Sequence, residues 1–174
     1  EIARTIVERL KGVLHAGHVP KTQVLGKNTE AYLLFLRGRQ YTASRTEDGF
    51  RKAVDCFERS LELEPENTQA LVGLARSLIN LADFGWEPED SAYSRAREAV
   101  DRALSLDPRW GMAHAALGWI QLNHEINWAK AAESFDLALS LEPGNAPVLR
   151  QAGVMAAVQG RLDEAIALTQ RALD

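Results

Sequence analysis

The chain has 174 residues, of which 46% are hydrophobic and 25% are charged. These proportions are typical of a folded soluble protein, and the length suits one domain or one short repeat array. The formal net charge of −4 gives the chain as a whole no attraction to nucleic acid or to an anionic membrane surface. The single cysteine, Cys56, excludes an intrachain disulfide and favours a reducing, cytoplasmic location. No apolar run approaches the roughly 20 residues of a membrane span.

Residues 1–27 have a pattern of their own. "IARTIVERLKGVL" places apolar side chains along one helical face, which predicts an amphipathic helix, and "HAGHVPKTQVLGKN" indicates a connector. The helix either caps the structure that follows or ends an upstream domain. Because the chain starts at Glu1 without Met and stops inside a helical pattern, we expect it to be a piece of a longer protein. His15 and His18 form an H-x-x-H without nearby acidic or cysteine ligands, so we predict no metal site.

Three segments of the chain repeat one pattern: "KAVDCFERSLELEPEN" (52–67), "AREAVDRALSLDP" (96–108) and "KAAESFDLALSLEPGN" (130–145). Their small and apolar positions are spaced to form one helical stripe. A proline closes each helix, because the residue before a proline is forced out of the α region. In register, the matching positions are Ala53, Phe57, Ser60, Leu61 and Pro65; Ala96, Val100, Ala103, Leu104 and Pro108; and Ala131, Phe135, Ala138, Leu139 and Pro143.

A first apolar helix precedes each of these segments: "AYLLFLRGRQY", "ALVGLARSLINL" and "AHAALGWIQL". A fourth pair follows Pro143, with Gly153 and Ala165 twelve residues apart. The small residues indicate two antiparallel helices in close approach, and we expect Phe57 and Phe135 to fill the space between neighbouring pairs. One pair does not bury its apolar face alone, so the pairs must stack.

These patterns resemble the tetratricopeptide repeat (TPR), a helix–turn–helix of 34 residues, over residues 28–174. The resemblance implies an all-α, right-handed α-solenoid of about four TPR-like repeats with an N-terminal helix, the repeats spanning about 28–67, 68–110, 111–145 and 146–174. The prolines are 43 and 35 residues apart, so we expect longer turns between helices, with about nine extra residues in "ADFGWEPEDSAYSRA". Gln121, Ala156 and Thr169 stand where the family has aromatic residues.

The long second turn and the leading "IARTIVERL" look like bacterial TPR regions that follow nucleotide cyclase or winged-helix DNA-binding modules. This likeness implies an alternative function, a regulatory or self-association segment of a larger bacterial signalling enzyme or transcriptional regulator. No catalytic or DNA-reading residue of those modules is present in the chain.

No arrangement of residues indicates catalysis. The sequence lacks a phosphate-binding glycine loop and a serine nucleophile elbow. Cys56 stands among apolar positions, which favours a small buried hydrophobe over a nucleophile. His114 and His124 are ten residues apart and do not share a helix face. We therefore predict no catalytic residue, no metal site, no cofactor and no enzymatic activity.

In the TPR family, the first helix of each pair lines a concave groove. The resemblance therefore implies a noncatalytic module that binds a protein or peptide segment there, with aromatic and arginine side chains as the usual anchors. For Trp119, a place in the core between repeats is an equally good interpretation. The groove positions are Tyr32, Phe35, Arg39, Gln69, Arg76, Asn80, Met112, Trp119, Asn123 and Arg150.

Chaperone co-factors of this family hold a C-terminal carboxylate with a clamp of Lys, Asn and Arg. The matching positions are Phe35, Arg39, Gly73, Met112 and Ala116, and only Arg39 keeps a donor. We predict that the chain does not bind chaperone tails in that way.

Five basic residues surround the first turn: Arg37, Arg39, Arg45, Arg51 and Lys52. Acidic residues interleave with them, which favours a solvated, salt-linked surface over a phosphate contact. At the other end of the array, Ile166 and Leu173 lie near an uncovered face. Because repeat arrays normally shield that end, we predict either a homodimer through the C-terminal repeat or a continuing helix.

Overall fold

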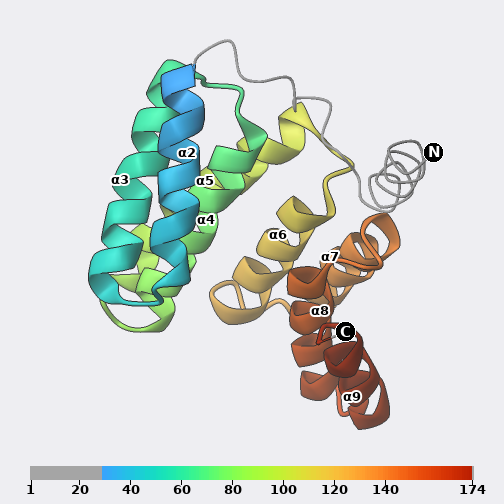
Figure 1. Ribbon diagram of the computed structural model, residues 1–174. Helices are drawn as coiled ribbons and strands as arrows, with labels where there is room; N and C mark the ends of the chain where they lie inside the picture. Colours follow the sequence, from blue (N-terminus) through green and yellow to red (C-terminus); the bar gives the residue numbers. More distant parts are fainter. Residues whose placement is uncertain (1–28, 174) are drawn as a thin grey trace, which may run out of the picture.

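A computed structural model describes residues 29–173, so the predicted N-terminal helix and connector, with His15 and His18, lie outside the described residues. The described chain is all-α (Figure 1). Its helices are α2 (Thr29–Ala43), α3 (Glu47–Leu63), α4 (Thr68–Asp83), α5 (Glu89–Leu106), α6 (Gly111–Asn123), α7 (Trp128–Leu141), α8 (Ala146–Val158) and α9 (Leu162–Arg171). None of these helices combines the length and the apolar composition that crossing a membrane requires.

The helices form four pairs that stack in chain order (Figure 1). The first helix of each pair contacts the first helix of the next, so α2, α4, α6 and α8 form a continuous inner layer. Among the described helices, the second helices α3, α5, α7 and α9 make no such contacts with one another. This difference curves the array around its inner layer, as in other solenoids. The predicted all-α helical-repeat solenoid is confirmed.

The three prolines end their helices as predicted. The residues before them, Glu64, Asp107 and Glu142, have φ of −138°, −137° and −135°, outside the α region. Each still donates its backbone N–H to the carbonyl four residues earlier. In two cases an asparagine then starts the next helix: the side-chain oxygens of Asn67 and Asn145 accept backbone N–H groups at 3.0 and 3.4 Å.

Small residues permit the close approach of helices that the sequence predicts. The Phe57 ring lies between α2 and α4, and a Cβ added at Gly38 or Gly73 would come within 2.7 or 2.6 Å of it. A Cβ added at Gly118 would likewise come within 3.0 Å of the Phe135 ring. In the last repeat the Thr169 hydroxyl replaces the ring and would lie 3.2 Å from a Cβ at Gly153. The two phenylalanines are 1% exposed, so they fill the space between pairs.

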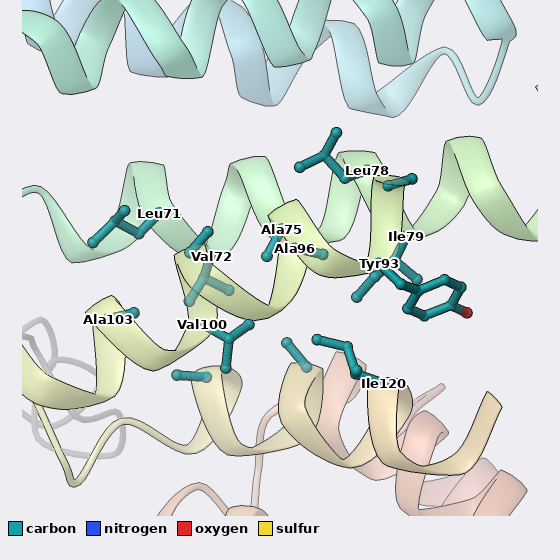
Figure 2. Close-up of a cluster of buried hydrophobic side chains, with 14 of the residues drawn as sticks. Leu71, Val72, Ala75, Leu78, Ile79, Tyr93, Ala96, Val100, Ala103 and Ile120 are labelled. Carbon is teal, nitrogen blue, oxygen red and sulfur yellow. The ribbon is translucent and has the colours of Figure 1, made fainter. Parts of the chain in front are cut away.

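The largest apolar cluster joins the second and third repeats (Figure 2). Leucine, isoleucine and valine side chains such as Leu71, Ile79 and Val100 alternate in it with alanines such as Ala75 and Ala96. Full burial of a large apolar side chain contributes about 1.5–3 kcal/mol. Alanines keep the helices near enough for these contacts to form.

The extra length of the second repeat does not lie mainly in its turn, contrary to our expectation. The turn comprises only residues 84–88, whereas α4 has 16 residues against 13 in α6, and α5 has 18 against 14 in α7. The added turns of helix bury Leu81, Ala92 and Tyr93. Burial of these side chains favours a longer helix pair over an exposed loop.

Each turn within a pair contains one residue with positive φ. In the second and fourth pairs it is glycine, Gly85 (71°) and Gly160 (76°), and in the first and third it is Arg45 (52°) and Ile126 (51°). Glycine adopts this left-handed conformation without strain, whereas a side chain, and above all a β-branched one, disfavours it.

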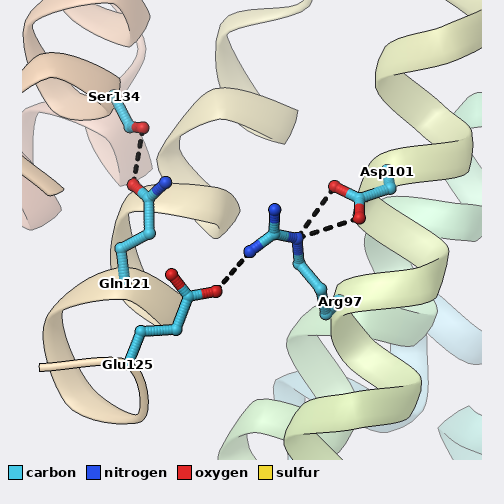
Figure 3. A network of polar contacts seen from close by, with 5 residues as sticks. All are labelled: Arg97, Asp101, Gln121, Glu125 and Ser134. Carbon is cyan, nitrogen blue, oxygen red and sulfur yellow. Dashed lines mark hydrogen bonds and ion pairs between the residues drawn. The ribbon is translucent and has the colours of Figure 1, made fainter. Parts of the chain in front are cut away.

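Polar contacts also join neighbouring helices (Figure 3). Arg97 of α5 bonds Asp101 at 2.9 Å and forms an ion pair with Glu125, which follows α6. Gln121, which replaces an expected aromatic residue, accepts a buried hydrogen bond of 2.7 Å from the Ser134 hydroxyl. The polar substitution is therefore matched by a partner on the second helix of the same pair.

Candidate functional site

A cavity of about 640 Å³ opens between the inner helices, and we call it the inner cavity. Its volume is within the range of ligand pockets in proteins, about 300–1,000 Å³. All four repeats contribute side chains to it. It is lined by Arg39, Thr42, Ala43, Arg45, Phe50, Phe57, Gly73, Arg76, Ile79, Asn80, Asp83, Phe84, Trp119, Arg150, Gln151 and Val154.

The structure brings half of the predicted groove residues together in this cavity. They are Arg39, Arg76, Asn80, Trp119 and Arg150. The other five do not line it: Tyr32, Phe35, Gln69, Met112 and Asn123. The five residues left out include those near the start of α2, α4 and α6.

Phe35 differs most from its predicted role as an apolar anchor. Its side chain is 5% exposed, and its ring centroid is 6.2 Å from that of Phe57. Tyr32 lies 6.2 Å from the Phe35 ring and is 38% exposed, away from the cavity. Burial against Phe57 makes Phe35 part of the core between the first two repeats, so a ligand would reach it only by displacing that core.

Trp119 satisfies both interpretations of the sequence. It lines the inner cavity, and it also packs against the apolar clusters on both sides of α6. Its indole Nε1 donates a hydrogen bond of 2.9 Å to Asp83. A tryptophan held by packing and by one hydrogen bond presents a rigid apolar surface at low entropic cost.

Asp83 connects the second and third repeats at the wall of the cavity. Its other oxygen accepts a 2.5 Å hydrogen bond from the Tyr93 hydroxyl. Tyr93 is buried and stacks on His124 at 4.8 Å. Burial and the bond to Asp83 together raise the pKa of Tyr93 well above its usual range. Each oxygen of Asp83 thus accepts one hydrogen bond from a neutral donor.

Arginine side chains dominate the charge of the cavity. Arg76 is half-buried, and burial, together with the charge of Arg150, lowers the pKa of its guanidinium. The Arg39 guanidinium lies over the Phe35 ring, 5.7 Å from its centroid. Asn80 turns its amide toward the helix and donates to the Arg76 carbonyl at 2.6 Å. The cavity is therefore cationic, with an apolar wall.

The rim carries aromatic side chains from helix α3 and from the turn between α4 and α5. Phe84 is 49% exposed, with its ring centroid 4.7 Å from that of Trp86 and 6.3 Å from that of Phe50. Sequence reasoning missed Phe50, Phe84, Asp83 and Gln151. The spacing of Arg76, Asn80 and Asp83 on one helix face was a usable signal for Asp83. No comparable pattern identified the rim, because its rings come from a helix of the first repeat and a turn of the second.

The basic residues around the first turn have different environments. Arg51 pairs with Glu47 at 2.9 Å and Lys52 with Asp48 at 2.7 Å, the salt-linked arrangement that the sequence favours. Arg39 and Arg45 instead line the inner cavity. Exposed pairs of the first kind contribute little to stability, about 0–1 kcal/mol each.

Metal-binding and nucleophilic groups are few in the described part of the chain. No group of three or more His, Cys, Asp and Glu side chains within residues 29–173 is arranged to hold a metal ion. Cys56 is buried, and burial raises the pKa of its thiol, which reduces its reactivity.

Comparison with known proteins agrees with the geometry. Residues 91–147 and 126–174 match the tetratricopeptide repeat family. Over 121 residues, 70% of this chain, the sequence is 26% identical to Superkiller protein 3 of Schizosaccharomyces pombe, of which the match spans only 8%.

Solved structures with the same fold have low sequence identity. The type IV pilus biogenesis factor PilW has a TM-score of 0.63 at 22% identity, over 84% of this chain and 62% of PilW. The first TPR domain of human RPAP3 has a TM-score of 0.60 at 16% identity, over 77% of this chain and 95% of that domain. The first TPR of Spaghetti, bound to the HSP90 peptide SRMEEVD, has the same TM-score and identity, over 79% and 98%. The family match thus identifies residues 91–174 as tetratricopeptide repeats, and the shared fold shows that the described chain has the same helical-repeat architecture.

Proposed function

We propose that the chain is a noncatalytic binding module that holds a segment of a partner protein in the inner cavity. The observation that carries this proposal is the convergence of Trp119 and three arginines from separate repeats on one cavity of about 640 Å³. Tryptophan and arginine are enriched among the residues that dominate binding energies. The Spaghetti TPR domain, which has the same fold, was solved with a peptide bound.

A selection experiment tests the proposal. A phage-displayed library of random twelve-residue peptides is selected on the folded chain, and the affinity of the recovered peptides is measured by fluorescence anisotropy. Trp119→Ala removes the cavity wall, whereas Val154→Trp fills the cavity without deleting a core residue, since Val154 is 39% exposed. Trp128→Ala is the matched control, because Trp128 is 57% exposed and lies outside the cavity.

We expect both cavity variants to weaken binding at least about tenfold, the effect of losing one binding hot spot. Trp128→Ala should bind like the unmodified chain. Circular dichroism would establish that all three variants are folded. Recovery of no peptide, or binding by both cavity variants as tight as that of the unmodified chain, would contradict the proposal.

A second candidate function is self-association through the C-terminal repeat. In α9, Leu162 and Ile166 are 63% and 57% exposed, and Leu173 just beyond it is 83% exposed. Contiguous exposed apolar side chains are typical of interaction surfaces. Such a face would serve a regulatory segment of a larger bacterial signalling protein in the cytoplasm, without direct contact to nucleic acid.

Sedimentation equilibrium distinguishes the two functions. A homodimer through α9 should become monomeric in Ile166→Glu, and Leu106→Glu, an exposed leucine of α5 (41% exposed), should leave it dimeric. A chain that is monomeric at high concentration would rule out the homodimer and leave peptide binding unaffected.

A further inference from the structure

The charge of the inner cavity is opposite to that of the whole chain. Four arginines line it, Arg39, Arg45, Arg76 and Arg150, against one acidic residue, Asp83, whereas the complete chain has a net charge of −4. Asp83 forms no ion pair with these arginines within residues 29–173, and its oxygens accept hydrogen bonds from Tyr93 and Trp119. The cavity is thus a local cationic site in an acidic protein.

Several arginines outside the cavity have carboxylate partners, which three of the cavity arginines lack. Arg51, Arg95, Arg97 and Arg161 all form ion pairs with carboxylates. Within residues 29–173, no carboxylate oxygen lies within 4.0 Å of the guanidinium nitrogens of Arg39, Arg76 or Arg150. The donors in the cavity are therefore free to bind an anion.

Arg76 and Arg150 lie two repeats apart in the chain and face the same space. Arg76 projects from α4 and Arg150 from α8, and both border the cavity beside Trp119 of α6. A guanidinium remains charged at any ordinary pH, and the burial of Arg76 makes its repulsion by Arg150 stronger than in water. An anion between them would replace this repulsion with two charge-assisted interactions.

We propose that this site binds an aspartate or glutamate side chain from an internal segment of a partner protein, between the guanidinium groups of Arg76 and Arg150. The inference rests on the proposed binding function and names the chemistry of its ligand. Exposed Phe84 and half-buried Trp119 border the same cavity. They favour an apolar or aromatic residue next to the acidic one in the bound segment.

Charge argues against other occupants. Residues 1–28 of this chain contain five basic and two acidic side chains, so they do not complement a cationic cavity. A nucleic acid would meet a chain with a net charge of −4. A free C-terminal carboxylate lacks the clamp donors, since Phe35, Gly73, Met112 and Ala116 occupy those positions.

The phage library described above is a suitable probe, because its peptides are fused to the coat protein and have no free C-terminus. We expect an aspartate or glutamate at one fixed position in the selected peptides. These peptides are then synthesised with acetylated and amidated ends, and the acidic residue is changed to its amide. Affinities are measured for the unmodified chain, Arg76→Gln and Arg150→Gln. The matched control is Arg109→Gln, which removes the same charge at an exposed residue outside the cavity.

Each change at the site, in peptide or protein, should weaken binding at least tenfold. Once Arg76 is replaced, the acid-to-amide change should weaken binding less than it does in the unmodified chain, because one of the two interactions of the carboxylate is already lost. Arg109→Gln should alter affinity less than threefold. Testing Arg150→Gln alongside keeps the result decisive if one variant folds poorly.

Three results would overturn the inference. Selected peptides that lack a fixed acidic residue, and that Arg76→Gln and Arg150→Gln bind as tightly as the unmodified chain, would refute it while peptide binding itself survived. A phosphoserine at the fixed position that bound more than tenfold tighter would assign the site to phosphate. Recovery of no peptide would refute both the ligand class and the proposed function.

Discussion

The Phe57 ring of the first repeat lies against Gly73 of the second so closely that a methyl group at residue 73 would come within 2.6 Å of Cζ. On the other side of the ring, a Cβ added at Gly38 would come within 2.7 Å of it. Because a rigid ring between two backbones has nowhere to move, the two glycines and the phenylalanine form one packing unit.

Gly73→Ala should therefore destabilise the array. Overpacking costs about 1–3 kcal/mol, more than the roughly 1 kcal/mol that alanine gains over glycine within a helix. We expect urea denaturation to show a net loss of about 1 kcal/mol in the free energy of unfolding. Combining it with Phe57→Leu should reduce the additional loss. Gly144→Ala is the control, since no atom lies within 4 Å of a Cβ there, and equal stability of Gly73→Ala and Gly144→Ala would contradict the packing argument.

The turn of the third pair should be improved by glycine. Ile126 has a φ of 51° and is 64% exposed, so its side chain contributes strain and little burial. Strain of this kind costs about 1–3 kcal/mol, and the greater freedom of glycine in the unfolded chain offsets part of that gain, about 0.4–1 kcal/mol. Ile126→Gly should therefore raise the free energy of unfolding by about 1 kcal/mol.

The reverse change, in the turn of the fourth pair, provides the comparison. Gly160→Ala, at a φ of 76° with open space around it, should lower the thermal midpoint. If Ile126→Gly also lowered it, the contacts of the isoleucine would outweigh its strained backbone.

Alkaline pH should reduce the stability that Tyr93 contributes to the folded chain. The pKa of Tyr93 is raised in the folded chain, so the folded state keeps its proton where the unfolded state, with a pKa near 10, has lost it. The unfolded state then binds fewer protons, and stability falls as pH rises above about 10. Tyr93→Phe should be less stable than the unmodified chain at pH 7 because the bond to Asp83 is lost.

That difference in stability should shrink as the pH rises beyond 10. Urea denaturation of both proteins across pH 7 to 11 measures it. A constant difference over the whole range would mean that Tyr93 titrates alike in both states.

The buried bond between Ser134 and Gln121 should matter more than exposed hydroxyl bonds on the same helix. Ser134→Ala leaves the Gln121 oxygen unpaired at 6% exposure, and an unsatisfied buried polar group costs about 1–3 kcal/mol. Ser140→Ala removes an exposed bond to the Leu137 carbonyl of 2.8 Å and should be nearly neutral. Gln121→Leu should restore part of the stability of Ser134→Ala, and a failure to do so would indicate that the pair contributes through shape alone.

The sequence by itself determined the helix pairs and their stacking. A proline fixes the conformation of the residue before it, so Pro65, Pro108 and Pro143 mark three helix ends without any tertiary information. Glycine and alanine at helical spacing likewise predict close approach, which the Phe57 and Phe135 contacts confirm. These are local effects, because each depends on a few consecutive residues.

Only the tertiary structure decided which side chains meet in the inner cavity. The family pattern selected ten groove positions, yet five of them lie outside it, and Phe35 is in the core because Phe57 fills the space beside it. The extra residues of the second repeat extend both of its helices and put Asp83 at the cavity wall. The convergence of Arg76, Trp119 and Arg150 depends on the rotation accumulated from one repeat to the next, which no single repeat encodes.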